Sequence, residues 1–391
     1  MASAGEDKRP GGERHFGLDW LRIGAFGLLI LYHIGMFFVP WGWHVKTAEP
    51  LDWVAIPMMA TNSWRLSLLF VVSGFASRAL IEKLRGAGQF ARERSLRLML
   101  PVIAGMILII PVQPWIELVT QHGYWHGFGW FWLHDYFRVG TLEGIMLPTW
   151  QHLWFVVYLW VYTLGLAVLS LMGLDRGQPL FDRVFGGVGL LVVPLIWVLT
   201  VALWLGRGAE ITHTLIDDPV GHLTYVPAFL FGVGLARSEQ VLATAERLWK
   251  PALALALIAY AGVIFLTSPG SMTLSDAKTV LREGCHAVMG WTMIVALIGI
   301  AGRYLNHDHP VRPKLTEAVF PFYIIHQTII VVVGWWVLRF ALPPALEFII
   351  LVTTTVGGCW YFYRVGRAVA WLRPWIGLRR IPAVACPPAR G

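Results

Sequence analysis

Charged residues are scarce in this chain. Asp, Glu, Lys and Arg make up 14% of its 391 residues, against about 25% in an ordinary soluble domain. Hydrophobic residues make up 57%, and the mean hydropathy is +0.61. This composition excludes a water-soluble enzyme and indicates a protein that lies in a lipid bilayer.

Cysteine is rarer still, with three residues, and several sequence motifs are missing. Cys285, Cys359 and Cys386 lie far apart without a C-x-x-C spacing, so neither a disulfide framework nor a zinc site is indicated and redox chemistry is excluded. The chain has no G-x-S-x-G elbow, no Walker A sequence and no haem motif. An ATP-driven pump is therefore unsupported.

Acidic residues are outnumbered, 23 against 31 Lys and Arg, which gives a formal net charge of +8. The basic residues occupy short segments between apolar stretches, as membrane topology requires, so nucleic acid is excluded as a partner. If the N-terminus is cytoplasmic, an even number of spans places 24 of the 31 Lys and Arg residues on the cytoplasmic side. This distribution predicts cytoplasmic N- and C-termini.

Apolar stretches of about 20 residues, the length of a membrane-spanning helix, occur ten times. The sequence thus predicts an all-α fold: a polytopic membrane helix bundle of about ten transmembrane helices over residues 16–375. The flanking segments 1–15 and 376–391 are rich in Gly, Pro and Arg and are predicted to be disordered tails. The ten stretches cover approximately residues 18–40, 62–81, 98–116, 150–172, 186–206, 222–236, 250–267, 285–302, 318–340 and 346–370.

Two ionisable residues of the first stretch are candidate functional residues, because such groups are costly inside a membrane. Arg22 lies near the inner boundary and His33 follows 11 residues later, which is about 16 Å along a helix at 1.5 Å per residue. A neutral imidazole can accept a proton from a hydroxyl and return it to a leaving group. A buried histidine that merely bonds a neighbouring helix gives the same sequence signal, so both interpretations stay open.

Arginines form a second group of candidates. Arg65, near the outer end of the second stretch, suits the orientation of an acceptor or the stabilisation of an oxyanion, and equally a side chain that reaches lipid head groups. Arg92, Arg94 and Arg97 cluster at the entrance of the third stretch. Guanidinium groups at a helix start suit phosphate groups, whereas topology alone also accounts for the cluster.

Four histidines in later stretches are candidate metal ligands. They are His152, His222, His286 and His326. None has the i, i+4 spacing of a pre-formed pair, and no carboxylate accompanies them in sequence. No metal site is therefore predicted.

Five sequence segments, taken together and in order, resemble the integral-membrane acyltransferase-3 superfamily, near its branch for the modification of periplasmic glucans. Ten helices is also the usual number in that family. The segments are LDWLR at 18–22 followed by His33, LLFVVSGF at 68–75, FARERSLRLMLP at 90–101, HLWF at 152–155 and FYIIHQ at 322–327.

The resemblance implies an enzyme of the bacterial inner (cytoplasmic) membrane, a multi-pass O-acyltransferase. Its donor substrate would be a cytoplasmic acyl-CoA, acetyl-CoA or succinyl-CoA, and its acceptor a hydroxyl of a carbohydrate or glycan at the outer face, without a metal. By the same resemblance, His33 is the catalytic residue. Arg92, Arg94 and Arg97 would hold the CoA phosphates, and the substrate-binding candidates are Arg22, Arg65, His152 and His326.

Two other functions compete with this interpretation. A transporter of a polar or anionic solute would line its path with His33, Arg65 and His326, but the chain shows no internal repeat and no matched pair of broken helices. A non-catalytic membrane scaffold or receptor needs neither an intramembrane histidine nor the inner arginine cluster. The sequence does not set the oligomeric state.

Overall fold

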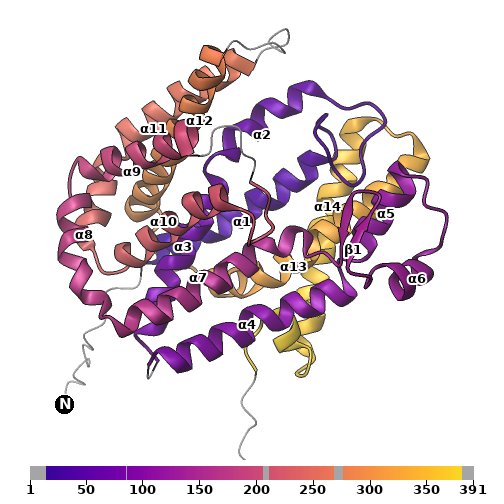
Figure 1. Cartoon of the computed structure of the whole chain (residues 1–391), viewed down its shortest axis with the longest axis horizontal. Coiled ribbons are helices and arrows are strands. Elements are labelled where there is room, and N and C mark those ends of the chain that lie inside the picture. The colour runs from indigo at the N-terminus through magenta and orange to yellow at the C-terminus, as the bar shows by residue number, and fades with distance from the viewer. Residues whose placement is uncertain (1–14, 85, 206–210, 268–275, 381–391) are drawn as a thin grey trace, which may run out of the picture.

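The chain folds into a bundle of long helices with a small strand ribbon (Figure 1). The computed structural model describes residues 15–84, 86–205, 211–267 and 276–380. The helices are α1 (Phe16–Met36), α2 (Ala55–Asn62), α3 (Arg65–Ile81), α4 (Ala87–Leu108), α5 (Val112–Gln121), α6 (Phe128–Trp130), α7 (Trp154–Leu171), α8 (Gln178–Phe185), α9 (Gly189–Thr200), α10 (Pro219–Leu235), α11 (Glu239–Thr267), α12 (Asp276–Tyr304), α13 (Arg312–Val337) and α14 (Pro344–Ala368). The strands β1 (Gly140–Leu142) and β2 (Ile145–Leu147) pair in antiparallel register, Gly140 opposite Leu147.

Eight helical segments of the described chain are long and apolar enough to cross a membrane. Two further helical segments, Leu174–Phe185 and Gly189–Leu205, are bent by 97° at their junction. They form a ninth candidate span if the pair is counted as one. The all-α membrane bundle is thus confirmed. The predicted stretches 186–206 and 222–236 correspond to this bent pair and to α10, which has 17 residues.

The short length of α10 has a local cause. Asp218 precedes the helix, and its side chain accepts a hydrogen bond from the backbone N–H of Gly221 at 3.0 Å. Pro219 occupies the first turn, where a missing N–H costs nothing. The helix therefore begins at Pro219, and the preceding residues form a loop near the cavity described below.

The first helix is the central element of the bundle. It packs against α13, α12, α3 and α14, which come from both halves of the chain. Figure 1 shows α11 and α12 side by side at one end of the molecule and α13 and α14 at the other. Because α1 lies between these two groups of helices, side chains near both ends of α1 lie in the interior of the bundle.

Helices α3 and α10 pack unusually closely through glycines. A side chain on Gly74 would bring its Cβ to 2.0 Å from the backbone oxygen of Phe229, and one on Gly232 would meet the oxygen of Val71 at 1.9 Å. Small residues allow this approach in membrane helices, where packing rather than the hydrophobic effect drives association. The segment around Gly74 therefore serves helix packing.

Substituting Gly74 with leucine is expected to destabilise the bundle by about 1–3 kcal/mol, because backbone atoms of α10 cannot move aside. The measurement is the thermal stability of the purified protein in detergent. Gly165→Leu is the matched control, since a Cβ there meets nothing within 4 Å. Equal stability of the two variants would contradict the packing role.

The C-terminal boundary differs from the predicted one. A 3₁₀ turn at Arg373–Ile376 leads into residues that pack on the bundle, with Ile376 and Leu378 buried in a cluster with Ala318 and Tyr363. The tail was predicted to begin at residue 376. The ordered region extends beyond that residue, because Ile376 and Leu378 pack against α13 and α14. Residues 1–14 and 381–391 lie outside the described residues.

Candidate functional site

His33 and His326 meet in the interior. His33 lies in the last turn of α1 and His326 lies on α13, fully buried. The Nδ1 atom of His33 is 2.8 Å from Nε2 of His326. Two of the sequence candidates, 293 positions apart, therefore form one hydrogen-bonded pair.

The bonds of His326 determine where the protons of the pair lie. Its Nδ1 is 2.8 Å from the carbonyl oxygen of Tyr323 and 3.2 Å from that of Phe322. A carbonyl oxygen accepts and never donates, so Nδ1 of His326 carries the proton and its Nε2 accepts. Nδ1 of His33 is then the donor of the pair. When both rings are neutral, Nε2 of His33 is left unprotonated.

A cavity of about 630 Å³ opens beside His33. Trp43 stacks on the His33 ring at 5.6 Å between centroids, and Trp150 and Trp154 add further aromatic surface. The size lies within the range of small-molecule sites. The remaining lining residues are Gly42, His44, Glu117, Ile145, Met146, Pro148, Thr149, Gln151, His152, Thr212, His213, Thr214 and Gln327.

His152 lies in the wall of this cavity, in the 3₁₀ turn Gln151–Leu153 that precedes α7. Its Nε2 donates to the carbonyl oxygen of Ile324 at 3.1 Å, and its ring lies 5.1 Å from that of His326. Its Nδ1 is buried and has no hydrogen-bond partner among the described residues, and the same holds for Nε1 of Trp43. A buried unpaired polar atom costs free energy unless something bonds it. Both residues line the cavity, but these two atoms lie beneath its surface.

Sequence reasoning missed His44, another histidine that lines the cavity. Nδ1 of His44 lies 2.5 Å from Oε2 of Glu117, and its Nε2 accepts from the amide of Gln327 at 3.1 Å. The same amide donates to Gln113 at 3.0 Å. The FYIIHQ segment contains Gln327, but the carboxylate comes from α5 and the histidine from a loop, so spacing alone carried no signal for this network.

Arg65 lies at the start of α3 with 3% of its surface exposed. Its guanidinium carbon lies 3.5 Å from the centre of the Tyr32 ring, and Nη1 donates to Thr61 at 3.3 Å. Its Nε has no partner, and no carboxylate pairs with it within the described chain. This burial excludes the reading in which Arg65 reaches lipid head groups. The positive charge of Arg65 therefore lies beside Tyr32, the residue before His33, without a carboxylate of the described residues to balance it.

Arginines gather at the other end of α1. Arg22, Arg94, Arg97 and Arg379 lie close enough to act electrostatically on one another. Arg94 donates to Ser77 at 3.2 Å, while Nε of both Arg22 and Arg94 is buried without a partner in the described structure. The structure thus places Arg22 with this arginine cluster, not with the cavity.

Arg92 lies apart from the arginine cluster. Residues two apart on a helix point to different faces, whereas Arg94 and Arg97, three apart, share one. Arg92 and Arg97 are both exposed, but Arg92 is not among the groups that act electrostatically on Arg94 or Arg97. Asp19, the acidic neighbour of Arg22, is already bonded to Arg312 at 2.6 Å, so the cluster keeps an excess of positive charge.

Within the described residues, no three His, Cys, Asp or Glu side chains are arranged as metal ligands. The absence of a metal stays a prediction. Chemistry at the cavity can use His33, which lines it and is bonded to His326. Arg65 does not line the cavity but lies close enough to act electrostatically on His33.

Comparison with known proteins decides the family. The family model described as an acyltransferase domain matches residues 15–364. The chain belongs to this acyltransferase family. The acyltransferase is similar to "Glucans biosynthesis protein C" of Escherichia coli O139:H28 (strain E24377A / ETEC) and of Escherichia coli (strain SMS-3-5 / SECEC). Each is 23% identical over 343 residues, which cover 83% of this chain and 84% of the relative. No solved structure matches it.

The family and the helices together describe a multi-pass membrane acyltransferase. Its single central helix joins the two groups of polar residues, since Arg22 and His33 both lie on α1. An acyl transfer needs a donor site and an acceptor site. The acyltransferase has two sets of polar residues, one around Arg22 and one around His33, near the two ends of α1.

A loop of the acyltransferase carries an ammonium group that faces backbone oxygens. Nζ of Lys46 donates to the carbonyl oxygens of Met36, at 3.1 Å, and of Trp41. The Met36 oxygen belongs to the C-terminal end of α1, which attracts cations. Burial nevertheless lowers the pKa of Lys46 from 10.5 to about 8, so the folded acyltransferase releases this proton more readily than the unfolded chain.

This lowered pKa gives the acyltransferase a pH-dependent stability. The folded form disfavours the ammonium of Lys46, which lowers the free energy of unfolding below pH 8. This destabilisation disappears as the pH rises from about 8 toward 10.5, where the folded form loses the proton first. We expect the stability of the wild type to gain about 1 kcal/mol over this interval, after allowance for partial exposure. The Lys46→Met variant should lack this gain. The measurement is the thermal unfolding temperature of both proteins between pH 7 and 10. The same pH dependence in the two proteins would contradict the prediction.

Proposed function

We propose that the acyltransferase moves an acetyl or succinyl group from acyl-CoA to a hydroxyl group of a carbohydrate, in a bacterial inner membrane. The observation that carries this proposal is the His33–His326 pair, which leaves an unprotonated ring nitrogen on a residue that lines the cavity. The name of the two relatives, which refers to glucans, supports a carbohydrate acceptor.

The donor binds at the arginine cluster in this proposal. Phosphate groups suit several guanidinium groups that lack a carboxylate partner. The excess of positive charge around Arg22, Arg94 and Arg97 supports the binding of the CoA phosphates there. The spacing of 11 residues from Arg22 to His33, about 16 Å on a helix, compares with the reach of an extended pantetheine arm, so a thioester attached to that arm reaches His33.

The acceptor binds in the cavity. Aromatic faces stack on the apolar faces of sugar rings, while polar atoms bond the hydroxyl groups. Trp43, Trp150 and Trp154 supply the faces, and the polar lining residues Thr149 and Gln151 supply hydrogen-bonding groups. This combination favours a carbohydrate over a fully apolar acceptor.

The reaction starts at Nε2 of His33. This nitrogen takes the proton of the acceptor hydroxyl, the hydroxyl oxygen bonds to the thioester carbon, and the carbon–sulfur bond then breaks. The departing CoA thiolate receives the proton back from His33. Arg65 lies beside Tyr32 and supplies positive charge for the oxygen that becomes negative on the way.

A second route uses the same atom. Nε2 of His33 attacks the thioester itself and carries the acyl group briefly before the hydroxyl takes it. A single-turnover experiment without acceptor separates the two routes. Release of one equivalent of CoA per enzyme supports the acyl carrier, and no release supports direct transfer.

Reconstitution in vesicles tests the whole proposal. Acetyl-CoA or succinyl-CoA is added on one side of the membrane and a glucan oligosaccharide on the other, and product is identified by its mass. We expect acylated oligosaccharide, free CoA in equal amount, and activity only when donor and acceptor face opposite sides. A folded protein that neither binds an acyl-CoA nor forms product would refute the proposal.

A further inference from the structure

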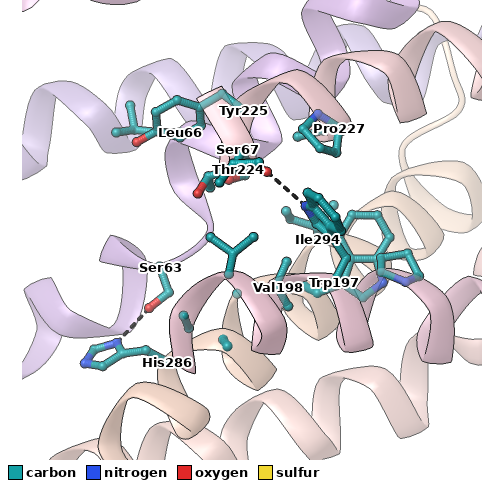
Figure 2. Close-up of a pocket in the computed structure, with 18 of the residues that line it drawn as sticks. Ser63, Leu66, Ser67, Trp197, Val198, Thr224, Tyr225, Pro227, His286 and Ile294 are labelled. Atoms are coloured by element: carbon teal, nitrogen blue, oxygen red, sulfur yellow. Dashed lines mark hydrogen bonds between the residues drawn. The ribbon is translucent and has the colours of Figure 1, made fainter. Parts of the chain in front are cut away.

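A second cavity lies among the helices, apart from His33. It has a volume of about 790 Å³ and is lined by α3, α9, α10 and α12 (Figure 2). Most of its wall is apolar, including Val198, Pro227 and Ile294. Trp197 donates its Nε1–H to the carbonyl oxygen of Leu223 at 2.9 Å, so its polar edge is satisfied. We call this space the lateral pocket.

One end of the lateral pocket is polar. Figure 2 shows Ser63 and His286 pointing toward each other there, with Oγ of Ser63 2.8 Å from Nδ1 of His286. Arg282 and Glu283 also line the pocket. Nε and Nη2 of Arg282 both bond the same oxygen of Glu283, each at 3.3 Å. A guanidinium has five N–H donors, and in the described part of the chain those of Arg282 bond only Glu283. The other donors of Arg282 can bind an anion.

The opposite side of the lateral pocket opens toward the surface of the bundle. Val193 and Trp197 of α9 line it and are 44% and 37% exposed. In a membrane-spanning region such exposed apolar side chains face lipid, where no water is present to enter. The bilayer's own hydrocarbon chains are therefore what reaches this opening.

The shape and the polarity match an amphipathic molecule. We propose that the lateral pocket holds one acyl chain of a glycerophospholipid, with the glycerol and phosphate at Ser63, His286 and Arg282. An apolar wall binds the chain, and the spare guanidinium donors of Arg282 bind the phosphate. A volume of 790 Å³ lies within the range of about 300–1,000 Å³ for ligand sites.

The bound lipid adjoins the cavity of His33 without entering it. Trp41 and Ile211 line the lateral pocket, and their neighbours Gly42 and Thr212 line the other cavity. The segments 41–42 and 211–212 therefore separate the lateral pocket from the cavity of His33. An acyl chain in the lateral pocket supports the wall behind His33.

A photoreactive phospholipid tests this proposal by binding rather than by catalysis. The purified full chain is reconstituted in vesicles that contain phosphatidylglycerol with a diazirine near the middle of one acyl chain, and cross-linked peptides are mapped. We expect labels on α9, α10 and α12. The Val198→Trp and Ala287→Phe variants, which fill the pocket, should reduce them about fivefold or more. Val168→Trp, on a 62% exposed position of α7 outside the pocket, should leave them unchanged.

The head group is tested separately. Arg282→Gln should reduce labelling by the phospholipid and leave labelling by a photoreactive diacylglycerol unchanged, since the latter lacks phosphate. Labels that persist in both filling variants would overturn the proposal, and so would labelling by a free fatty acid that equals that of the phospholipid. Because no acyl-CoA is present, failure here says nothing about the proposed acyl transfer.

Discussion

Replacing His33 with alanine is expected to lower the rate constant of acyl transfer by about 10³-fold or more, because a positioned proton acceptor is worth roughly 10²–10⁴-fold. The substitution removes the ring nitrogen that faces the cavity and leaves the arginine cluster at the other end of α1 unaltered. Binding of acyl-CoA should therefore persist with nearly the same affinity. The measurements are product formation at saturating donor and equilibrium binding of acyl-CoA by the same preparation.

Two comparisons make this result specific. His122→Ala removes an exposed histidine at the end of α5 and should keep full activity. His326→Gln removes the ring that accepts from His33 Nδ1, so that the His33 ring loses its fixed proton arrangement, and an intermediate loss with an altered pH profile is expected. A folded His33→Ala protein with wild-type transfer would contradict both routes through Nε2.

Replacing Arg94 with alanine is expected to raise the KM for acyl-CoA about 10- to 100-fold with little change in kcat, since one charge-assisted contact to phosphate is worth about 1.5–3 kcal/mol. Arg94 is chosen because its Nε is buried and unpaired beside Arg22 and Arg97. The effect should fall at high salt, which screens partly exposed charges. Steady-state kinetics at two ionic strengths provide the measurement.

Arg92→Ala is the matched control for this prediction. It removes the same charge from the same helix, only two residues away, but from an exposed position outside the arginine cluster. We expect its KM to change less than about threefold, as for most surface substitutions. Equal effects at both positions would show that total charge on the inner side, rather than the cluster, holds the donor.

The sequence was informative where polar residues are rare. Helices, and the exceptional positions of His33, Arg65 and His326 within apolar stretches, could be found because a bilayer imposes span length and penalises ionisable groups. The bent pair at α8 and α9 was not visible, since apolar composition does not report a 97° change of direction. A stretch of apolar residues predicts burial in the bilayer but not the path of the helix.

Contacts between distant segments were out of reach. The bond between His44 and Glu117 joins a loop to a helix 73 residues later, and no local periodicity relates the two. Arg22 was grouped with Arg65, His152 and His326 as a substrate-binding candidate, whereas the fold brings it close to Arg94 and Arg97 of α4. Spacing fixes the distance between residues on one helix, while the neighbours of that helix depend on tertiary packing.

The placement of Arg22 and His33 on one uninterrupted helix also limits how this family member can change in length. One residue inserted between them would turn His33 by about 100° and move it by about 1.5 Å, which takes its Nδ1 away from His326. An insertion after α5, in the loop that carries the strand ribbon, would leave both residues in register. The first helix is therefore a segment in which insertions and deletions abolish function even where every side chain is retained.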